Sequence, residues 1–87
     1  MLKPIGSKEQ NRVLFYHVFI SLGMADIFVH RCQIPPERAL AYARTFISEE
    51  VTIEILHRFS NRNWDYYNGT IPHGHLFLLQ SAFGTLL

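Results

Sequence analysis

Residues 34–47 read IPPERALAYARTFI, a stretch that marks the end of one helix and the start of another. Residues before a proline avoid the helical region, whereas Pro36 falls in the first turn of the following helix, where proline is favoured. Glu37 lies in the same turn, where a negative charge suits the helix dipole. An apolar stripe at helical spacing, flanked by Ala39 and Tyr42, contains Leu40, Ala43, Phe46 and Ile47. The stretch predicts a helix from Pro36 to about Ile47.

Two short helices are predicted next. Ser48 and Thr52 both offer an N-cap for the first, and Ser60 offers one for the second, which the turn dipeptide Asn68-Gly69 closes. The apolar residues that these two helices carry are Ile55, Leu56, Phe59, Trp64 and Tyr67.

A last helix is predicted to open at Pro72 and to run to the chain end, with Gly84 as a mild weakness. Its long apolar stripe consists of Leu76, Leu79, Phe83 and Leu86. This stripe predicts that the helix packs one face against the core.

The N-terminal third predicts two more helices. Residues 24–32 form the one that ends before the prolines. Upstream, Ser7 and Gln10 match a capping box, apolar residues recur at helical spacings as far as Leu22, and Gly23 is a plausible stop. Residues 7–22 are therefore predicted to form a separate helix, and residues 1–6 a loose tail. The alternative over residues 13–20 is a strand, because they are rich in β-branched and aromatic residues. Apolar residues occur nearly all round this segment, which would require burial on more than one face.

The predicted fold class is all-α: a compact five-helix bundle over residues 23–87 with an additional N-terminal helix over residues 7–22. From about Met24 to Leu87 the order of elements resembles a divergent sterile alpha motif (SAM) domain. The residues that carry the resemblance are Ile34-Pro35-Pro36, Ala39, Tyr42-Ala43, Phe46, Val51, Leu56, Trp64 to Thr70, Ile71, Gly74-His75, Leu76, Leu79 and Ala82. Two positions depart from the family pattern: Thr70 splits the usual glycine-isoleucine pair, and Leu76 replaces the usual basic residue.

The resemblance implies a protein–protein interaction module that self-associates or docks a partner. SAM domains commonly join head to tail through an end-helix surface at the start of the fifth helix and a mid-loop surface on the middle helices. The end-helix candidates here are Pro72, His73, Gly74 and His75. The mid-loop candidates are the acidic residues Glu49, Glu50, Glu54 and Asp65, although an ordinary solvated face explains them about as well. A helix N-terminus can receive a carboxylate without a Lys or Arg, because it carries free N–H groups.

The extra N-terminal segment offers a further possibility. Phe15, Tyr16 and Phe19 would pair two subunits if residues 7–22 were themselves the recognition element. The expected partner is a protein, either a second copy of the chain or another helical domain, in a homo- or hetero-oligomer.

Charge argues against a dedicated nucleic-acid binder. The formal net charge is only +1, and the last predicted helix contains no Lys or Arg. The alternative function, RNA or DNA binding, would rely on Arg38, Arg44, Arg58 and Arg62 for phosphate contacts.

No residue pattern predicts catalysis, a cofactor or a metal. The sequence contains no nucleophile elbow and no glycine-rich phosphate loop. His73-x-His75 offers two ligands where a zinc site needs three or four, and Cys32 is distant in sequence. We therefore expect a binding protein without enzymatic activity.

The lone Cys32 rules out an intramolecular disulfide and is most simply a small core residue. A single cysteine suits a reducing compartment, the cytosol or the nucleus. The N-terminus does not resemble a signal peptide, and the longest apolar stretch is shorter than the roughly 20 residues that span a bilayer. The sequence therefore predicts a soluble intracellular chain.

Overall fold

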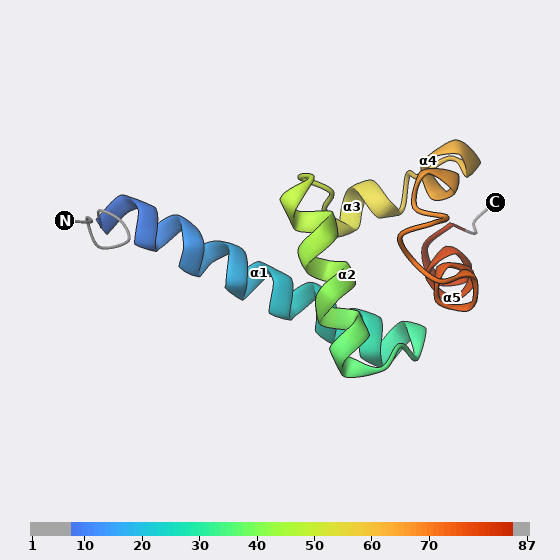
Figure 1. Ribbon diagram of the computed structural model, residues 1–87, viewed down its shortest axis with the longest axis horizontal. Coiled ribbons are helices and arrows are strands. Elements are labelled where there is room, and N and C mark those ends of the chain that lie inside the picture. The colour runs from blue at the N-terminus through green and yellow to red at the C-terminus, as the bar shows by residue number, and fades with distance from the viewer. Residues whose placement is uncertain (1–7, 85–87) are drawn as a thin grey trace.

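The described part of the chain is entirely helical. The computed structural model describes the backbone of residues 8–84 and the side chains of residues 17–84. Within this range there are five helices and no strand: α1 (Lys8–Cys32), α2 (Pro36–Ser48), α3 (Ile53–Leu56), α4 (Asn61–Tyr66) and α5 (His73–Phe83) (Figure 1). The predicted all-α class is confirmed.

The helix α1 is continuous from Lys8 to Cys32, so the predicted stop at Gly23 was wrong, and so was the strand alternative over residues 13–20. An interior glycine costs a helix only about 1 kcal/mol relative to alanine. The residues next to Gly23 recover more than that, because Met24 and Ala25 are buried apolar residues. The predicted boundary between residues 22 and 23 therefore falls inside one helix. The predicted cap at Ser7 lies outside the described residues.

The side-chain caps of the short helices follow the sequence closely. Thr52 accepts a hydrogen bond from the backbone N–H of Ile55 at 3.3 Å and caps α3. Ser60 and Asn63 form a reciprocal capping box at the start of α4. Ser48 does not cap α3, because it belongs to the last turn of α2, where its hydroxyl donates to the carbonyl of Thr45 at 2.8 Å.

The core gathers where the C-terminal half of α1 packs against α2, with α5 beside them. Phe28 is fully buried at its centre and meets the rings of Phe46 and Phe83 edge to face, with centroids 5.9 and 6.0 Å away. The fully or nearly buried apolar residues of α2 are Ala39, Tyr42, Ala43 and Phe46. The buried stripe of α2 is thus centred about one residue away from the predicted one, since Leu40 and Ile47 are only half-buried.

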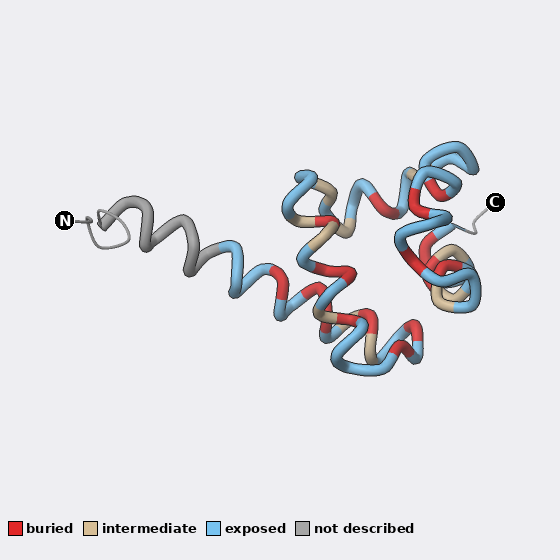
Figure 2. The backbone as a smooth tube through the Cα atoms, in the orientation of Figure 1, coloured by how far each residue is buried: buried red, intermediate tan, exposed pale blue. Residues whose placement is uncertain are grey.

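The N-terminal half of α1 projects away from this core. A 25-residue helix is about 37 Å long, and α1 contributes to the elongated molecular extents of 51 × 24 × 22 Å. Figure 1 shows α2 crossing the C-terminal half of α1, and Figure 2 shows buried positions in that half. Among the side chains described, the first buried one is Ser21. The fold therefore consists of a helical bundle and a projecting helical arm.

No helix in residues 8–84 combines the length and the apolar character that crossing a bilayer requires.

Candidate interaction surfaces

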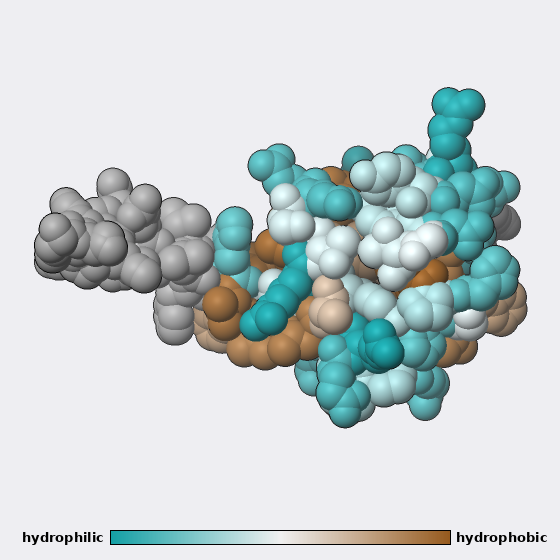
Figure 3. Space-filling model, viewed as in Figure 1, coloured by the Kyte–Doolittle hydropathy of each residue, from teal (hydrophilic) through white to brown (hydrophobic). Residues whose placement is uncertain are grey.

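The middle of α1 carries apolar side chains in contact with solvent. We call this the α1 apolar surface; it consists of Val18, Phe19, Ile20 and Leu22, each at least one-third exposed. Phe19 is the most exposed of the four, at 66 %. Figure 3 shows apolar surface gathered where α1 enters the bundle. This surface exists because α1 continues past the last helix that could cover it.

A groove runs alongside this surface, between α1 and the C-terminal end of α2. Its largest part has a volume of about 360 Å³ and lies between α1 and residues Ile47, Ile53 and Glu54. A second part of about 240 Å³ shares Ile20 and Ile47 with the first and adds His17 and Glu50. We call this hollow the α1 groove. Its lining is mainly apolar and includes two acidic residues, Glu50 and Glu54.

The structure separates the four acidic residues predicted for a mid-loop surface. Glu50, in the left-handed region with φ 63°, and Glu54 are exposed and border the α1 groove. Glu49 is engaged within the molecule, where its carboxylate accepts a hydrogen bond from the hydroxyl of Tyr67. Burial raises the pKa of Tyr67 above its ordinary value, and the hydrogen bond to Glu49 raises it further. Glu49 is therefore part of the α2–α4 junction.

Asp65 does not line the α1 groove, which Glu50 and Glu54 border. It lines a different one of about 250 Å³, together with His73 and Phe77. A predicted mid-loop residue and a predicted end-helix residue thus share one hollow. Trp64 borders the same hollow, and its buried indole N–H has no hydrogen-bond partner among the described residues.

The predicted end-helix residues divide into an exposed and a packed set. Pro72 is the N-cap of α5 and provides no side-chain cap, and His73 and Gly74 are exposed beside it. His75 is half-buried, and its Nδ1 lies 2.6 Å from the hydroxyl oxygen of Tyr42. His75 therefore serves the α2–α5 junction.

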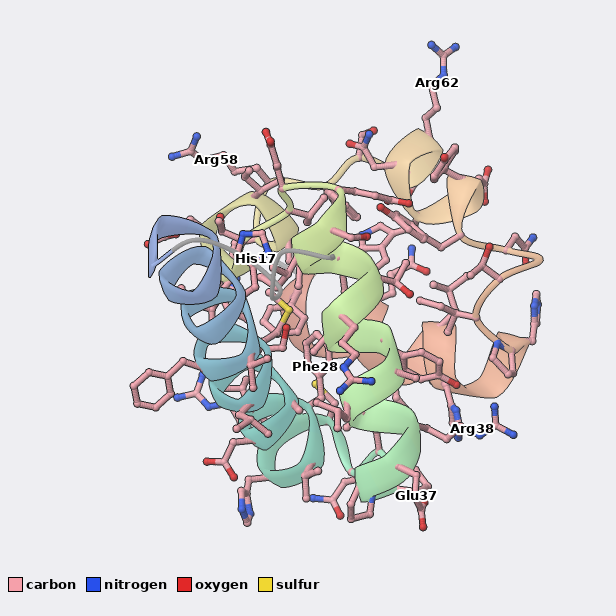
Figure 4. All side chains as sticks on the ribbon, turned by 60° about the vertical axis from the view of Figure 1, so that its left-hand side comes forward. His17, Phe28, Glu37, Arg38, Arg58 and Arg62 are labelled. Carbon is pink, nitrogen blue, oxygen red and sulfur yellow. The ribbon has the colours of Figure 1, made fainter. Side chains whose placement is uncertain are left out.

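The four arginines proposed for phosphate contacts do not form one stripe. Figure 4 shows Arg38, Arg58 and Arg62 pointing to different sides of the molecule. Arg44 lines a small hollow of about 180 Å³ beside His17 and Val18. Their placement gives no support to a nucleic-acid surface, which requires clustered cations.

Histidine and cysteine side chains are also dispersed. The described residues contain no group of three or more His, Cys, Asp or Glu side chains that could hold a metal ion. Cys32 is a buried core residue, and burial raises the pKa of its thiol. It has the environment of a structural cysteine, since burial in apolar surroundings disfavours the thiolate.

The sequence pointed to only part of the α1 apolar surface. Phe19 was a predicted partner-binding residue and is exposed, whereas the side chains of Phe15 and Tyr16 lie outside the described range. Val18, Ile20 and Leu22 were not predicted to bind. The sequence did indicate an exposed apolar surface in one respect. Residues 13–20 are apolar nearly all round the helix, and packing on one face cannot bury all of them.

No protein-family model matches the chain, and neither a curated protein nor a solved structure shows significant similarity to it. The fold and its surfaces define a class in structural terms. It is a small all-α bundle whose longest helix projects and carries an exposed apolar surface.

Proposed function

We propose that this chain is a protein–protein interaction module that binds through the α1 apolar surface. The observation that carries the proposal is the exposure of Val18, Phe19 and Leu22 on a helix that projects from the core. Each Å² of apolar surface removed from water contributes roughly 25 cal/mol, so covering these side chains favours association. Apolar clusters on a surface mark contact sites for proteins or membranes.

Helix energetics support the same function. A helix that is apolar nearly all round is normally buried on several faces, and the sequence of residues 13–22 is of this kind. Isolated helices shorter than about 12–15 residues are marginal in water, because their stability comes mainly from packing. A partner packed on the arm would supply the contacts that the bundle does not.

SAM-type contacts provide a second candidate surface. The observation in its favour is that α5 begins without a side-chain cap, with His73 and Gly74 exposed beside its free N–H groups. Glu50 is an exposed acidic residue that could meet such an end in another molecule. This head-to-tail contact would build open chains, because its two halves differ.

A matched pair of substitutions tests the proposed function. Phe19 is 66 % exposed and Tyr66 is 71 % exposed, but only Phe19 lies on α1. We expect Phe19→Ser to reduce binding, and Tyr66→Ser to leave it unchanged. Binding is measured both as self-association by sedimentation and as capture of proteins from a cell extract by the immobilised chain.

The other candidates make different predictions in the same assays. If His73→Glu reduces association and Phe19→Ser does not, the contact is of the SAM type and the α1 proposal fails. If no substitution alters association or capture, the interaction function itself is rejected. Binding to mixed oligonucleotides at low salt, falling steeply as salt rises, would instead favour the nucleic-acid alternative.

A further inference from the structure

We propose that the α1 groove binds an amphipathic helix of another protein, one that carries basic residues beside its apolar stripe. The inference rests on the proposed function of the chain and specifies the class of its partner. Its physical basis is the combination of an apolar lining, an open glycine position and two acidic side chains in the same groove.

The lining of the α1 groove is apolar on three helices. Ile20 and Ile27 come from α1. Ile47 comes from α2 and Ile53 from α3. The two parts of the groove, of about 360 and 240 Å³, adjoin each other because both are lined by Ile20 and Ile47. Ligand pockets have volumes of roughly 300–1,000 Å³, so the groove is large enough to take apolar side chains of a partner.

The α1 side of the groove has the spacing of a helix–helix contact. Ile20, Gly23 and Ile27 line it at intervals of three and four residues, over about 10 Å of the helix axis. Nothing lies within 4 Å of where a Cβ of Gly23 would be. The glycine therefore leaves a gap between two larger side chains, and a side chain of a packed helix fits into such a gap.

The backbone of the partner favours a helix over an extended segment. The described residues contain no strand, so the groove offers no sheet edge to an incoming chain. An extended segment would bring backbone N–H and C=O groups against the apolar lining without hydrogen-bond partners, which costs free energy. A helix satisfies these groups internally and presents apolar side chains at positions i, i+3, i+4 and i+7.

Two acidic side chains determine the charge that the partner needs. Glu50 lines one part of the groove and Glu54 the other; both are exposed, and no Lys or Arg lines either part. Between residues whose side chains are described, the only ion pair joins Asp26 and His30, so neither glutamate is neutralised by a neighbour. Lys or Arg beside the apolar stripe of a partner would be attracted to both glutamates, whereas an acidic helix or an anionic membrane surface would be repelled.

The backbone at Glu50 provides a matched pair of test positions. Glu50 follows the C-cap of α2 with φ 63°, and its N–H donates to the carbonyl of Ile47 at 2.9 Å. Glycine is the usual residue at this point of a helix end, because it adopts a positive φ without strain. Gln33, after the end of α1, has φ 62° but does not line the groove. Glycine therefore suits both backbones, and only at Glu50 does it remove a charge from the groove.

Selection from a displayed library of helical peptides tests the charge of the partner. The library has apolar residues at positions i, i+3, i+4 and i+7, and its flanking positions vary among Lys, Arg, Glu, Asp, Gln and Ser. We expect peptides selected on the full chain to carry Lys or Arg beside the stripe about three times as often as Glu or Asp, because each exposed ion pair is weak. Selection without this excess, or no selected peptide, overturns the proposal.

Substitutions test whether a selected basic peptide lies in the α1 groove, with fluorescence anisotropy to measure Kd. We expect Glu50→Gly to raise Kd about threefold. Gly23→Leu fills the gap on α1 and should raise Kd by about tenfold, equivalent to about 1.4 kcal/mol. Gln33→Gly is the control: neither glycine variant should unfold at a lower urea concentration than the wild type, but only Glu50→Gly should weaken binding. A wild-type Kd in either Glu50→Gly or Gly23→Leu overturns the groove as the site.

The outcomes separate this proposal from the proposed function. If Phe19→Ser reduces protein capture but no basic helical peptide is selected, the interaction function stands and the basic helix is overturned. If Gly23→Leu abolishes peptide binding but Phe19→Ser changes neither capture nor self-association, the groove stands and the α1 apolar surface fails. Self-association that Gly23→Leu abolishes and that displaces the peptide would identify a second copy as the occupant and overturn the partner helix. Circular dichroism of each variant shows whether its helices are intact.

Discussion

The hydroxyl oxygen of Tyr42 in α2 lies 2.6 Å from Nδ1 of His75 in the first turn of α5. Their rings also meet edge to face, with centroids 5.7 Å apart. One hydrogen bond thus connects two helices that are 33 positions apart in sequence. Substitution of His75 would disturb this junction as well as any external contact, so His73 is the cleaner probe of an end-helix surface.

Replacement of Tyr42 by Phe is expected to destabilise the fold by about 1 kcal/mol, because a largely buried hydroxyl is lost and Nδ1 of His75 loses its partner. Urea unfolding at neutral pH measures the change. Tyr66→Phe is the control, since Tyr66 is 71 % exposed and should tolerate the change. Equal stability of the two variants would show that the Tyr42–His75 bond contributes nothing.

The stability of the fold is expected to decline in alkali. Burial, the hydrogen bond to Glu49 and the charge of Glu49 raise the pKa of Tyr67 in the folded chain, and burial raises that of Tyr42. Above the ordinary pKa of tyrosine, the unfolded chain therefore loses the hydroxyl protons of Tyr42 and Tyr67 while the folded chain keeps them. Their stabilisation is therefore complete below about pH 10, the ordinary value for tyrosine, and is lost as the pH rises further.

Urea unfolding at neutral pH and above pH 10 measures this decline, and Tyr67→Phe should make it shallower. The same variant loses the bond to Glu49 and is expected to be less stable at neutral pH. An unchanged alkaline slope in Tyr67→Phe would remove Tyr67 as a cause.

Alanine substitution is expected to have opposite effects at two glycines. Gly23→Ala should stabilise α1 by roughly 0.5–1 kcal/mol, because the position is helical and the added methyl group meets open space. Gly84→Ala should be destabilising, since its Cβ would lie 2.9 Å from the carbonyl oxygen of Gln80 and 3.2 Å from Nε1 of Trp64. Thermal unfolding is measured at dilution, so that monomers are compared. A Gly23→Ala variant less stable than the wild type would contradict the open environment of this position.

Two phenylalanines should differ sharply on truncation. Phe28→Ala removes the centre of the core and is expected to cost about 3–5 kcal/mol, a large part of the roughly 4–13 kcal/mol typical of a chain this size. Phe77→Ala removes a side chain that is 66 % exposed and should change stability by less than about 0.5 kcal/mol. Urea midpoints compare the two, and similar losses would contradict the placement of the core.

Local chemistry made several helix ends predictable. Proline is favoured in the first turn of a helix, so Pro36 and Pro72 indicated where α2 and α5 begin. Thr52 and Ser60 offer hydroxyl acceptors to free N–H groups, and they indicated where α3 and α4 begin. The SAM resemblance, which rests mainly on such core and turn positions, stays a prediction.

Tertiary packing decided the rest. Glycine weakens a helix by an amount that burial of its neighbours outweighs, so the continuity of α1 through Gly23 depended on the burial of Met24 and Ala25. The sequence by itself determined that the N-terminal segment is apolar on nearly every side. Only the tertiary structure decided which part is covered, because exposure depends on where the neighbouring helices end, and they leave Val18, Phe19 and Leu22 in contact with solvent.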